Sequence, residues 1–366
     1  MDAQHAHADG RWAAGRRALR RPPWLVLILV AALVLAGCAR AGTPASGPGG
    51  QDGTKAAAPG GGPSSEGADG AAAAAAGDKP PLTYLICFEP GGQSDIEARR
   101  QQPHLERLLG RKVVIDYKVG GGGALCWSEL ARRRPDGSVV AGINVPHIIL
   151  QPLQQEAGYR TEQIEPVAFF QSTPLGLAVL ASSPYRTLAD LLEAAREKPG
   201  EISVGGSGTF TGHHVATARL ERLAGVDLAY VPFNGAAPQM TAFLGGHVTA
   251  VFANSNDLTK YAGRIRVLAL AAEERFRGLP DVPTFRELGI DLVERIDRGV
   301  GVPAGTPEPV IRELEAAFLR IAEDAAIRAR MEEEGFVPLA LGREESKRHI
   351  AALSEAYRTV AEDLRR

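Results

Sequence analysis

Short runs of branched apolar residues alternate along the chain with longer segments whose apolar positions recur every three or four residues. The short runs predict strands at 82–88, 113–117, 139–143, 176–180, 248–252 and 265–270. The longer segments predict helices at 95–109, 124–134, 187–198, 212–224 and 237–244. Strands and helices that alternate in this way imply βαβ crossovers, and therefore mostly parallel sheets covered by helices on both faces.

Two further segments near the C-terminus predict amphipathic helices, because their apolar residues recur at helical spacing. The first stripe consists of Ile311, Leu314, Phe318 and Ile321, and the second of Ile350, Leu353, Tyr357, Val360 and Leu364.

The N-terminus has a different apolar pattern. A segment with several arginines precedes an apolar run at 24–34, and the small residues Leu35-Ala36-Gly37 then lead to Cys38. This order is typical of a secretory signal, and the run is well short of the ~20 residues that cross a bilayer. We predict a lipoprotein signal peptide over 1–37, acylation of Cys38, and a mature protein in the periplasm or at the cell exterior, anchored to a membrane.

The segment 38–80 consists almost entirely of Ala, Gly, Pro and Ser with a few charges. Such a composition cannot bury enough apolar surface to offset its ordering entropy, which predicts a disordered tether behind the lipidated cysteine. The remaining residues suit one large α/β domain or two of ordinary size, and two is the preferred interpretation.

The charge, the cysteines and the histidines indicate which partners and bound groups the chain lacks. The formal net charge is −2 with acids and bases interspersed, so nothing attracts nucleic acid. Cys87 and Cys126 fall near loops at one end of a predicted sheet, where they form either a disulfide or two buried thiols. His213-His214 has no accompanying metal-ligand pattern, and we expect neither a metal nor a cofactor.

Three glycine-rich turns each open a predicted helix, at 90–95, 120–123 and 205–209, and the first two directly follow predicted strands. Glycine allows close approach of a ligand to the backbone, and the free N–H groups of a helix start attract anions such as small carboxylates or phosphates. Taken alone, each turn would be interpreted as an ordinary tight connection in preference to a binding loop.

Nucleotide and esterase motifs are absent from these turns. No G-x-x-x-x-G-K-[ST] occurs, and Gly206, Gly208 and Gly212 miss the dinucleotide fingerprint by one residue. Around Ser207, Thr209 stands where a nucleophile elbow requires glycine. No nucleophile, base and orienting acid occur together, so we expect no enzyme, and an α/β hydrolase-like activity is disfavoured.

Several motifs occur in the order found in one known family. They are Pro90-Gly91-Gly92 with Asp95, the glycine run before Pro135-Asp136-Gly137, Gly206-Ser207-Gly208-Thr209 with His213, AGVD at 224–227, VPFNG at 231–235, LGG at 244–246, LPDVPT at 279–284 and PAGTP at 303–307. The chain resembles the Bug or TctC family, the extracytoplasmic solute receptors of tripartite tricarboxylate transporters. The resemblance covers essentially everything after the tether.

The resemblance implies a periplasmic-binding-protein-like type II fold, in which two α/β lobes are joined by two crossovers and the ligand lies between them. Mapped onto this chain, lobe 1 would comprise 81–183 and 299–366, and lobe 2 would comprise 184–298. The implied function is a monomeric receptor that captures a small organic carboxylate and passes it to membrane permease subunits. A ligand-sensing receptor that docks on a membrane signalling partner uses the same closure and stays open as an alternative.

The family holds carboxylates chiefly with backbone N–H groups and bridging waters. The expected ligand-binding residues are Phe88, Gly91, Gly92, Ser94 and Asp95 from lobe 1, Ser207, Gly208, Thr209 and His213 from lobe 2, and the side-chain donors Asn144 and Asn234. We expect Asp95 to fix its loop, because two carboxylates in contact repel. The structural alternatives are turn-forming glycines, helix-capping hydroxyls and a packed histidine.

Two residues depart from the family pattern. Glu89 places a carboxylate near an expected anion site, and Arg298 replaces an aromatic residue on the return strand. Arg298 is either a ligand-specific charge or a solvated surface residue, and both departures bear on which ligand is bound.

Overall fold

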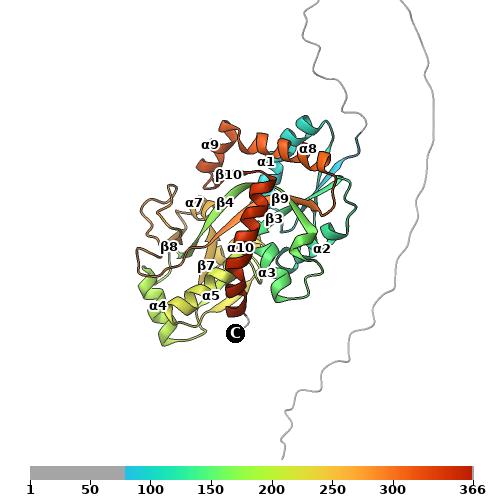
Figure 1. Cartoon of the computed structure of the whole chain (residues 1–366). Coiled ribbons are helices and arrows are strands. Elements are labelled where there is room, and N and C mark those ends of the chain that lie inside the picture. The colour runs from blue at the N-terminus through green and yellow to red at the C-terminus, as the bar shows by residue number, and fades with distance from the viewer. Residues whose placement is uncertain (1–78, 365–366) are drawn as a thin grey trace, which may run out of the picture. The chain divides into compact units, whose positions relative to one another are not determined.

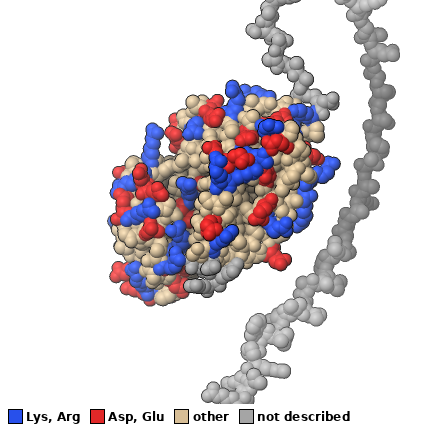
Figure 2. Space-filling model, in the orientation of Figure 1, with Lys and Arg blue, Asp and Glu red and all other residues tan. Residues whose placement is uncertain are grey.

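The computed structural model describes residues 79–364 (Figure 1). The predicted signal peptide, Cys38 and nearly all of the predicted tether therefore lie outside the described residues. Within the described part, no helix combines the length and apolar character needed to cross a membrane. Acidic and basic side chains are interspersed over the face shown in Figure 2, without a surface of one sign.

A first sheet forms around two parallel ladders, since β1 (Leu82–Ile86) pairs in parallel with both β2 (Val113–Tyr117) and β3 (Val139–Val145). Antiparallel strands complete it, namely β9 (Arg295–Pro303), the first part of β4 (Ile164–Leu180) and β10 (Val337–Leu341). The helices that follow these strands are α1 (Gln93–Leu109), α2 (Ala124–Arg132), α3 (His147–Gln154), α8 (Glu308–Ala322), α9 (Ala325–Glu333) and α10 (Arg343–Asp363), with short 3₁₀ turns η1 (Gly121–Gly123) and η2 (Thr161–Gln163).

A second sheet has the same plan. Strand β5 (Ser203–Gly206) pairs in parallel with β6 (Ala229–Pro232) and β7 (Ala250–Asn254), while the second part of β4 runs antiparallel to β7 and β8 (Ile265–Ala271). Its helices are α4 (Leu188–Glu197), α5 (Gly212–Ala224), α6 (Ala236–Leu244) and α7 (Ser255–Lys260).

Strand β4 is 17 residues long because it serves both sheets. Its residues up to Pro174 pair with β9 and β10, and from Leu175 onward it pairs with β7 and β8. The chain returns from the second sheet to the first through the segment between β8 and β9. The fold class predicted from the sequence, two α/β lobes joined by two crossovers, is confirmed, and the antiparallel pairing is confined to the crossing strands and their neighbours.

Each sheet buries apolar side chains on both faces. In the first sheet, one core lies beneath α1 and α8 and the other beneath α2, α3 and α10. In the second, Leu175, Leu177 and Val179 of β4 face one core, while Ala178 faces the other. This alternation follows the period of two expected for a strand with two covered faces.

Every predicted strand and helix is present, with boundaries shifted by a few residues and β4 extended toward the N-terminus. Among the strands and α-helices of the described residues, the sequence patterns missed seven, which are β5, β6, β9, β10, α3, α7 and α9.

Candidate functional site

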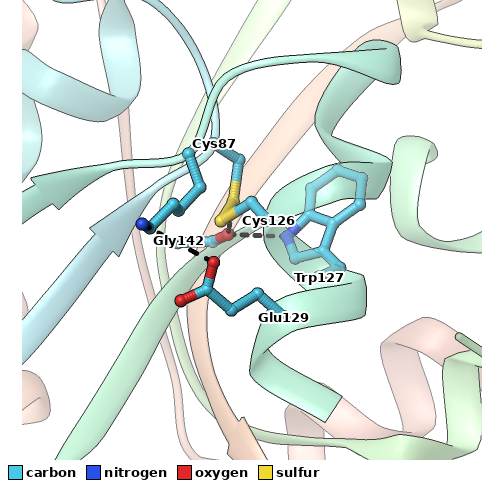
Figure 3. Close-up of a disulfide and its surroundings, with 6 residues drawn as sticks. Cys87, Cys126, Trp127, Glu129 and Gly142 are labelled. Atoms are coloured by element: carbon cyan, nitrogen blue, oxygen red, sulfur yellow. Dashed lines mark hydrogen bonds and ion pairs between the residues drawn. A yellow bond between two sulfur atoms is a disulfide. The ribbon is translucent and has the colours of Figure 1, made fainter. Parts of the chain in front are cut away.

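The first glycine loop is anchored by a disulfide at the end of β1. Cys87 is bonded to Cys126 in α2, which resolves the choice left open by the sequence in favour of the disulfide (Figure 3). The adjacent Trp127 donates its indole N–H to the Gly142 carbonyl at 2.9 Å. Phe88 packs edge-on against Trp127, so the start of the loop is held by the core of the first lobe.

Asp95 fixes the same loop from the first turn of α1. Its Oδ2 accepts the Gly91 N–H at 2.8 Å, and its Oδ1 accepts the Tyr117 hydroxyl at 2.6 Å and Arg99 Nε at 2.8 Å. Both oxygens are therefore occupied by the protein itself. Gly91 has φ +83°, a conformation that a residue with a side chain rarely adopts.

The glycine loop of the second lobe is fixed by hydrogen bonds between its backbone and the side chains of a histidine, a threonine and a tyrosine. The Ser207 N–H donates to His213 Nδ1 at 3.0 Å, and the Gly208 carbonyl accepts the hydroxyls of Tyr230 at 2.6 Å and Thr211 at 2.9 Å. Because Nδ1 is an acceptor, the neutral imidazole of His213 carries its proton on Nε2. Burial and the nearby Arg298 guanidinium lower the pKa of His213 to about 3, so the ring is neutral at physiological pH.

Loops of the two lobes contact each other at several points. The Glu89 N–H donates to the Asn234 carbonyl at 3.3 Å, and Gln151 Nε2 in α3 donates to the Thr209 carbonyl at 2.7 Å. Gln93 Nε2 at the start of α1 donates to Asp257 Oδ2 of α7 at 2.6 Å. The described conformation is therefore a closed one, with the two lobes in contact.

Polar side chains line the crossing strands between the lobes. Asn144 of β3, Arg298 of β9 and Gln171 of β4 are direct cross-strand neighbours, so their side chains lie on one face of the sheet. Arg298 Nη1 donates to Thr173 Oγ1 at 2.6 Å, and Nη2 donates to Asn254 Oδ1 at 3.0 Å. This row connects the first sheet with the end of β7 in the second.

Many polar atoms in and around this row are buried without a partner. The atoms with no hydrogen-bond partner among the described residues include His147 Nδ1, Gln171 Nε2 and Oε1, His213 Nε2, Asn254 Nδ2 and Arg298 Nε. A buried unpaired polar group costs about 1–3 kcal/mol, so such groups cluster where a ligand or ordered water completes their bonds. The cluster marks the region between the lobes as the candidate binding site.

Helices that begin at the contacting loops lack side-chain caps. Neither α1, which begins after Gly92, nor α5, which begins after Thr211, has a side-chain acceptor for its first N–H groups. Among helices α1 to α9 of the described residues, side-chain caps occur only at α4, from Thr187, and at α9, from Asp324, whereas α2, α3, α6, α7 and α8 also begin without one. Uncapped helix starts beside unpartnered buried donors favour an anionic ligand.

The predicted site residues differ in how far the structure buries them. Phe88, Gly92, Asp95, Asn144, Ser207, Gly208 and His213 are buried. Ser94 is half-buried. Gly91, Thr209 and Asn234 are exposed, and they lie in the loops at the outer edge of the region between the lobes, which we call the rim. At Thr209 and Asn234, the backbone carbonyls make the contacts between the lobes.

Sequence reasoning missed several side chains of the polar cluster, above all His147, Gln171, Thr173 and Asn254. One signal was available, because the polar run Gln171-Ser172-Thr173 interrupts an otherwise apolar strand. Arg298 is 4% exposed, so its interpretation as a solvated surface residue is wrong. Glu89 is half-buried and lines a groove of about 490 Å³ at the rim.

Within residues 79–364, no three His, Cys, Asp or Glu side chains are grouped so that they could hold a metal ion. The polar cluster is rich in hydrogen-bond donors, which suits recognition of an oxyanion.

Comparison with known proteins identifies the family. The family model described as the tripartite tricarboxylate transporter family receptor matches residues 97–364. A protein of Cupriavidus necator, named as the UPF0065 protein in the gbd 5' region, is 30% identical over 240 residues, which are 65% of this chain and 73% of that protein.

Two solved structures are similar in fold and sequence. MatC from Rhodopseudomonas palustris, solved with bound malate, has a TM-score of 0.73 at 25% identity, over 76% of this chain and 98% of its own. A second protein of R. palustris, solved with adipate, has a TM-score of 0.73 at 27% identity, over 77% of this chain and 96% of its own. The chain therefore belongs to the solute-receptor family of the tripartite tricarboxylate transporters, as its sequence motifs predicted.

Proposed function

We propose that this protein is an extracytoplasmic receptor that captures a small organic carboxylate between its two lobes and delivers it to a membrane permease. The observation that carries the proposal is the set of buried, unpartnered donors around Arg298 and His213, beside helix starts without side-chain caps. Such an arrangement stabilises an oxyanion and performs no bond cleavage. We therefore propose a receptor without enzymatic activity.

The relatives support the chemical class of ligand. Malate and adipate, found in two similar structures, are both small organic acids. In this chain, Gly91 and Gly208 lie in loops fixed by Asp95 and Tyr230, so their backbone is held in place before a ligand arrives. A preorganised loop adds affinity because little ordering entropy is lost on binding.

We further propose the division into lobe 1 (81–183 and 299–366) and lobe 2 (184–298), and a lipid anchor at Cys38 followed by the tether 38–80. A single acyl-modified cysteine at the end of a flexible segment would keep a monomeric receptor near its permease. Membrane fractionation tests the anchor, since Cys38→Ser should release a folded receptor into the soluble fraction. A Cys38→Ser protein that remains acylated and membrane-bound would refute it.

A panel of small mono-, di- and tricarboxylates tests the ligand class by thermal shift, followed by calorimetry on each hit. A ligand that binds only the native state raises the unfolding midpoint as its concentration increases. We expect at least one carboxylate to stabilise the protein, whereas uncharged amides of the same acids should not. If no carboxylate of the panel binds, the proposed function is wrong.

A further inference from the structure

A disulfide joins two segments of lobe 1 that both touch lobe 2 (Figure 3). Cys87 directly precedes Phe88, and Cys126 lies in the first turn of α2, just behind the glycine turn at 120–123. Both cysteines are buried in the core of the first lobe beneath α2 and α3. The bond therefore lies behind the surface at which the lobes meet, where it holds both segments without touching a ligand.

The first segment meets lobe 2 at Phe88 and Glu89. Gly235 of lobe 2 lies so close that a Cβ atom there would be 3.3 Å from both Phe88 Cβ and the Glu89 backbone nitrogen. The Glu89 N–H also donates to the Asn234 carbonyl at 3.3 Å. These contacts involve backbone atoms on both sides, so they form only if the segment after Cys87 is held in one position.

The second segment, the glycine turn at 120–123, meets lobe 2 at Gly122. A Cβ atom on Gly122 would lie 2.6 Å from the Thr209 carbonyl oxygen, closer than real side chains approach. All four glycines of the turn have positive φ, between +57° and +142°. Glycine loses more conformational freedom on folding than any other residue, so a run of four is entropically costly to hold in one arrangement. The turn therefore needs firm support next to it in the chain.

Trp127 completes a support that both segments share. It is fully buried, it donates its indole N–H to the Gly142 carbonyl of β3 at 2.9 Å, and its ring contacts the Phe88 ring edge-on with 6.2 Å between centroids. A Cβ atom on Gly123 would overlap the Trp127 ring, so the end of the glycine turn also packs on it. Because Cys126 directly precedes Trp127, the disulfide fixes this ring relative to the end of β1.

Building on the proposed function, we infer that the Cys87–Cys126 disulfide positions Phe88, Glu89 and the glycine turn at 120–123 for closure against lobe 2. Cys87 and Cys126 are positioning residues and touch no ligand. Without the bond the chain folds, but the two segments must then be ordered when the lobes close, and that entropy cost lowers the affinity for the carboxylate. The bond thus raises the ligand affinity of the receptor in addition to the stability of its fold.

Hydrogen–deuterium exchange measures the positioning directly and needs no ligand. The comparison is between the full-length Cys38→Ser protein, which has no third thiol, and Cys87→Ala/Cys126→Ala in the same background. The Gly91 and Gly123 amides are hydrogen-bonded in the structure. They should exchange about tenfold or more faster in the disulfide variant, because the segments that carry them open locally more often.

Leu314→Ala is the matched control. Leu314 is fully buried in the other core of the first lobe, so its truncation and the loss of the disulfide lower the stability by similar amounts. Calorimetry with malate and adipate should give at least about tenfold weaker binding for the disulfide variant and at most about threefold weaker binding for Leu314→Ala. Should the double variant fail to fold, protein reduced in urea and refolded with reductant present takes its place.

Unchanged exchange at Gly91 and Gly123 would overturn the inference. Equal losses of affinity in the disulfide variant and in Leu314→Ala would overturn it too, because the bond would then act through global stability alone. A chain that does not fold at all without the bond would have the same consequence. The proposed function is decided separately, since it fails only if no carboxylate of the panel binds the unmodified protein. If neither malate nor adipate binds, the exchange rates alone decide the inference.

Discussion

His213 lies in the first turn of α5 with its ring completely buried. Its Nδ1 holds the glycine loop through the Ser207 N–H, and its Nε2–H remains available for a ligand or water. Burial and Arg298 keep the ring uncharged, so it acts as a neutral donor. At this scale the site combines the buried guanidinium of Arg298 with the neutral donor His213.

We predict that His213 contributes no pH dependence to binding between pH 6 and 8. Its pKa of about 3 lies far below this range, so any pH dependence of the affinity comes from titration of the ligand itself. Calorimetry on the unmodified protein and on His213→Gln should give affinity profiles of the same shape. A drop in affinity as pH rises through ~6.5 that disappears in His213→Gln would show that the ring binds as a cation.

The lowered pKa of His213 also predicts how the free energy of unfolding changes with pH. A histidine whose pKa is lowered in the folded state takes up protons mainly when the chain unfolds, so its contribution to stability is lost as pH falls below ~6.5. Between pH 6.5 and pH 5, the unmodified protein should lose more stability than His213→Gln, by at most ~1.4 kcal/mol per pH unit. Urea unfolding at several pH values measures the difference, and parallel curves would contradict the lowered pKa.

At the scale of elements, the glycine loops form the contact between the lobes. A Cβ atom on Gly208 would lie 3.1 Å from the Cα of Gly122, in the glycine turn at 120–123, and 3.1 Å from Thr211 Cγ2 of its own loop. A Cβ atom on Gly91 would meet only the Ala237 side chain, at 3.8 Å. The second-lobe loop therefore has less room for a side chain in the closed conformation than the first.

We predict that Gly208→Ala weakens ligand binding about tenfold or more, because the added methyl group obstructs closure against Gly122. Gly225→Ala is the matched control, since Gly225 also has a positive φ but a Cβ there meets nothing within 4 Å. Gly208→Ala should lose more stability than Gly225→Ala in urea unfolding, because φ +131° at Gly208 lies outside the left-handed region that φ +63° at Gly225 occupies. Comparable ligand affinity in the two variants would remove the loop contact from the binding reaction.

The disulfide joins the end of β1 to α2 across a separation of 39 residues. By the chain-entropy relation, a closed loop of this size stabilises the folded state by at most roughly 4 kcal/mol. We predict that a reductant lowers the urea midpoint of the unmodified protein but not that of a Cys87→Ser/Cys126→Ser variant. Equal midpoints with and without reductant in the unmodified protein would mean that the bridge contributes nothing.

Sequence patterns found the elements whose periodicity is strong and missed those governed by distant contacts. Strand β5 is short and half glycine, so it has no apolar signature of its own. Strand β9 carries Asp297 and Arg298 at its centre, a pair that local propensity disfavours in a buried strand. Its burial depends on His349 of α10 and on Thr173 of β4, residues that only the fold brings together.

The candidate binding site was likewise predictable only where its residues are close together in the sequence. The glycine turns and the loop-fixing role of Asp95 were predictable, because they depend on a strand, a turn and a helix that are contiguous in sequence. Gln171, Arg298 and Asn254 become neighbours through the register of β4, β7 and β9. No local pattern encodes that register. A polar run within an apolar strand indicates only that the run faces other polar groups or a ligand instead of an apolar core.

At the scale of the whole molecule, two crossing segments and α10 connect the lobes. Helix α10 packs against α3 and β4, and its Tyr357 hydroxyl donates to Glu294 just before β9. Arg219 of α5, in the other lobe, pairs with the same carboxylate. These contacts lie beside the crossing segments, whereas the loop contacts between Glu89 and Asn234 lie at the rim. Rotation about the crossings would break the rim contacts first.

We predict that the ligand-free receptor populates open conformations and that ligand shifts it to the closed one, because only the closed form brings the glycine loops of both lobes to the ligand. Spin labels at Leu108→Cys and Leu288→Cys, both exposed positions on different lobes, report the change in a Cys38→Ser background. Their distance distribution should narrow onto one value at ligand saturation. Labels at Leu108→Cys and Val114→Cys, within one lobe, should show no change. Identical inter-lobe distributions with and without ligand would mean that the lobes do not close on binding, and access to the buried cluster around Arg298 would then require motion of the glycine loops alone.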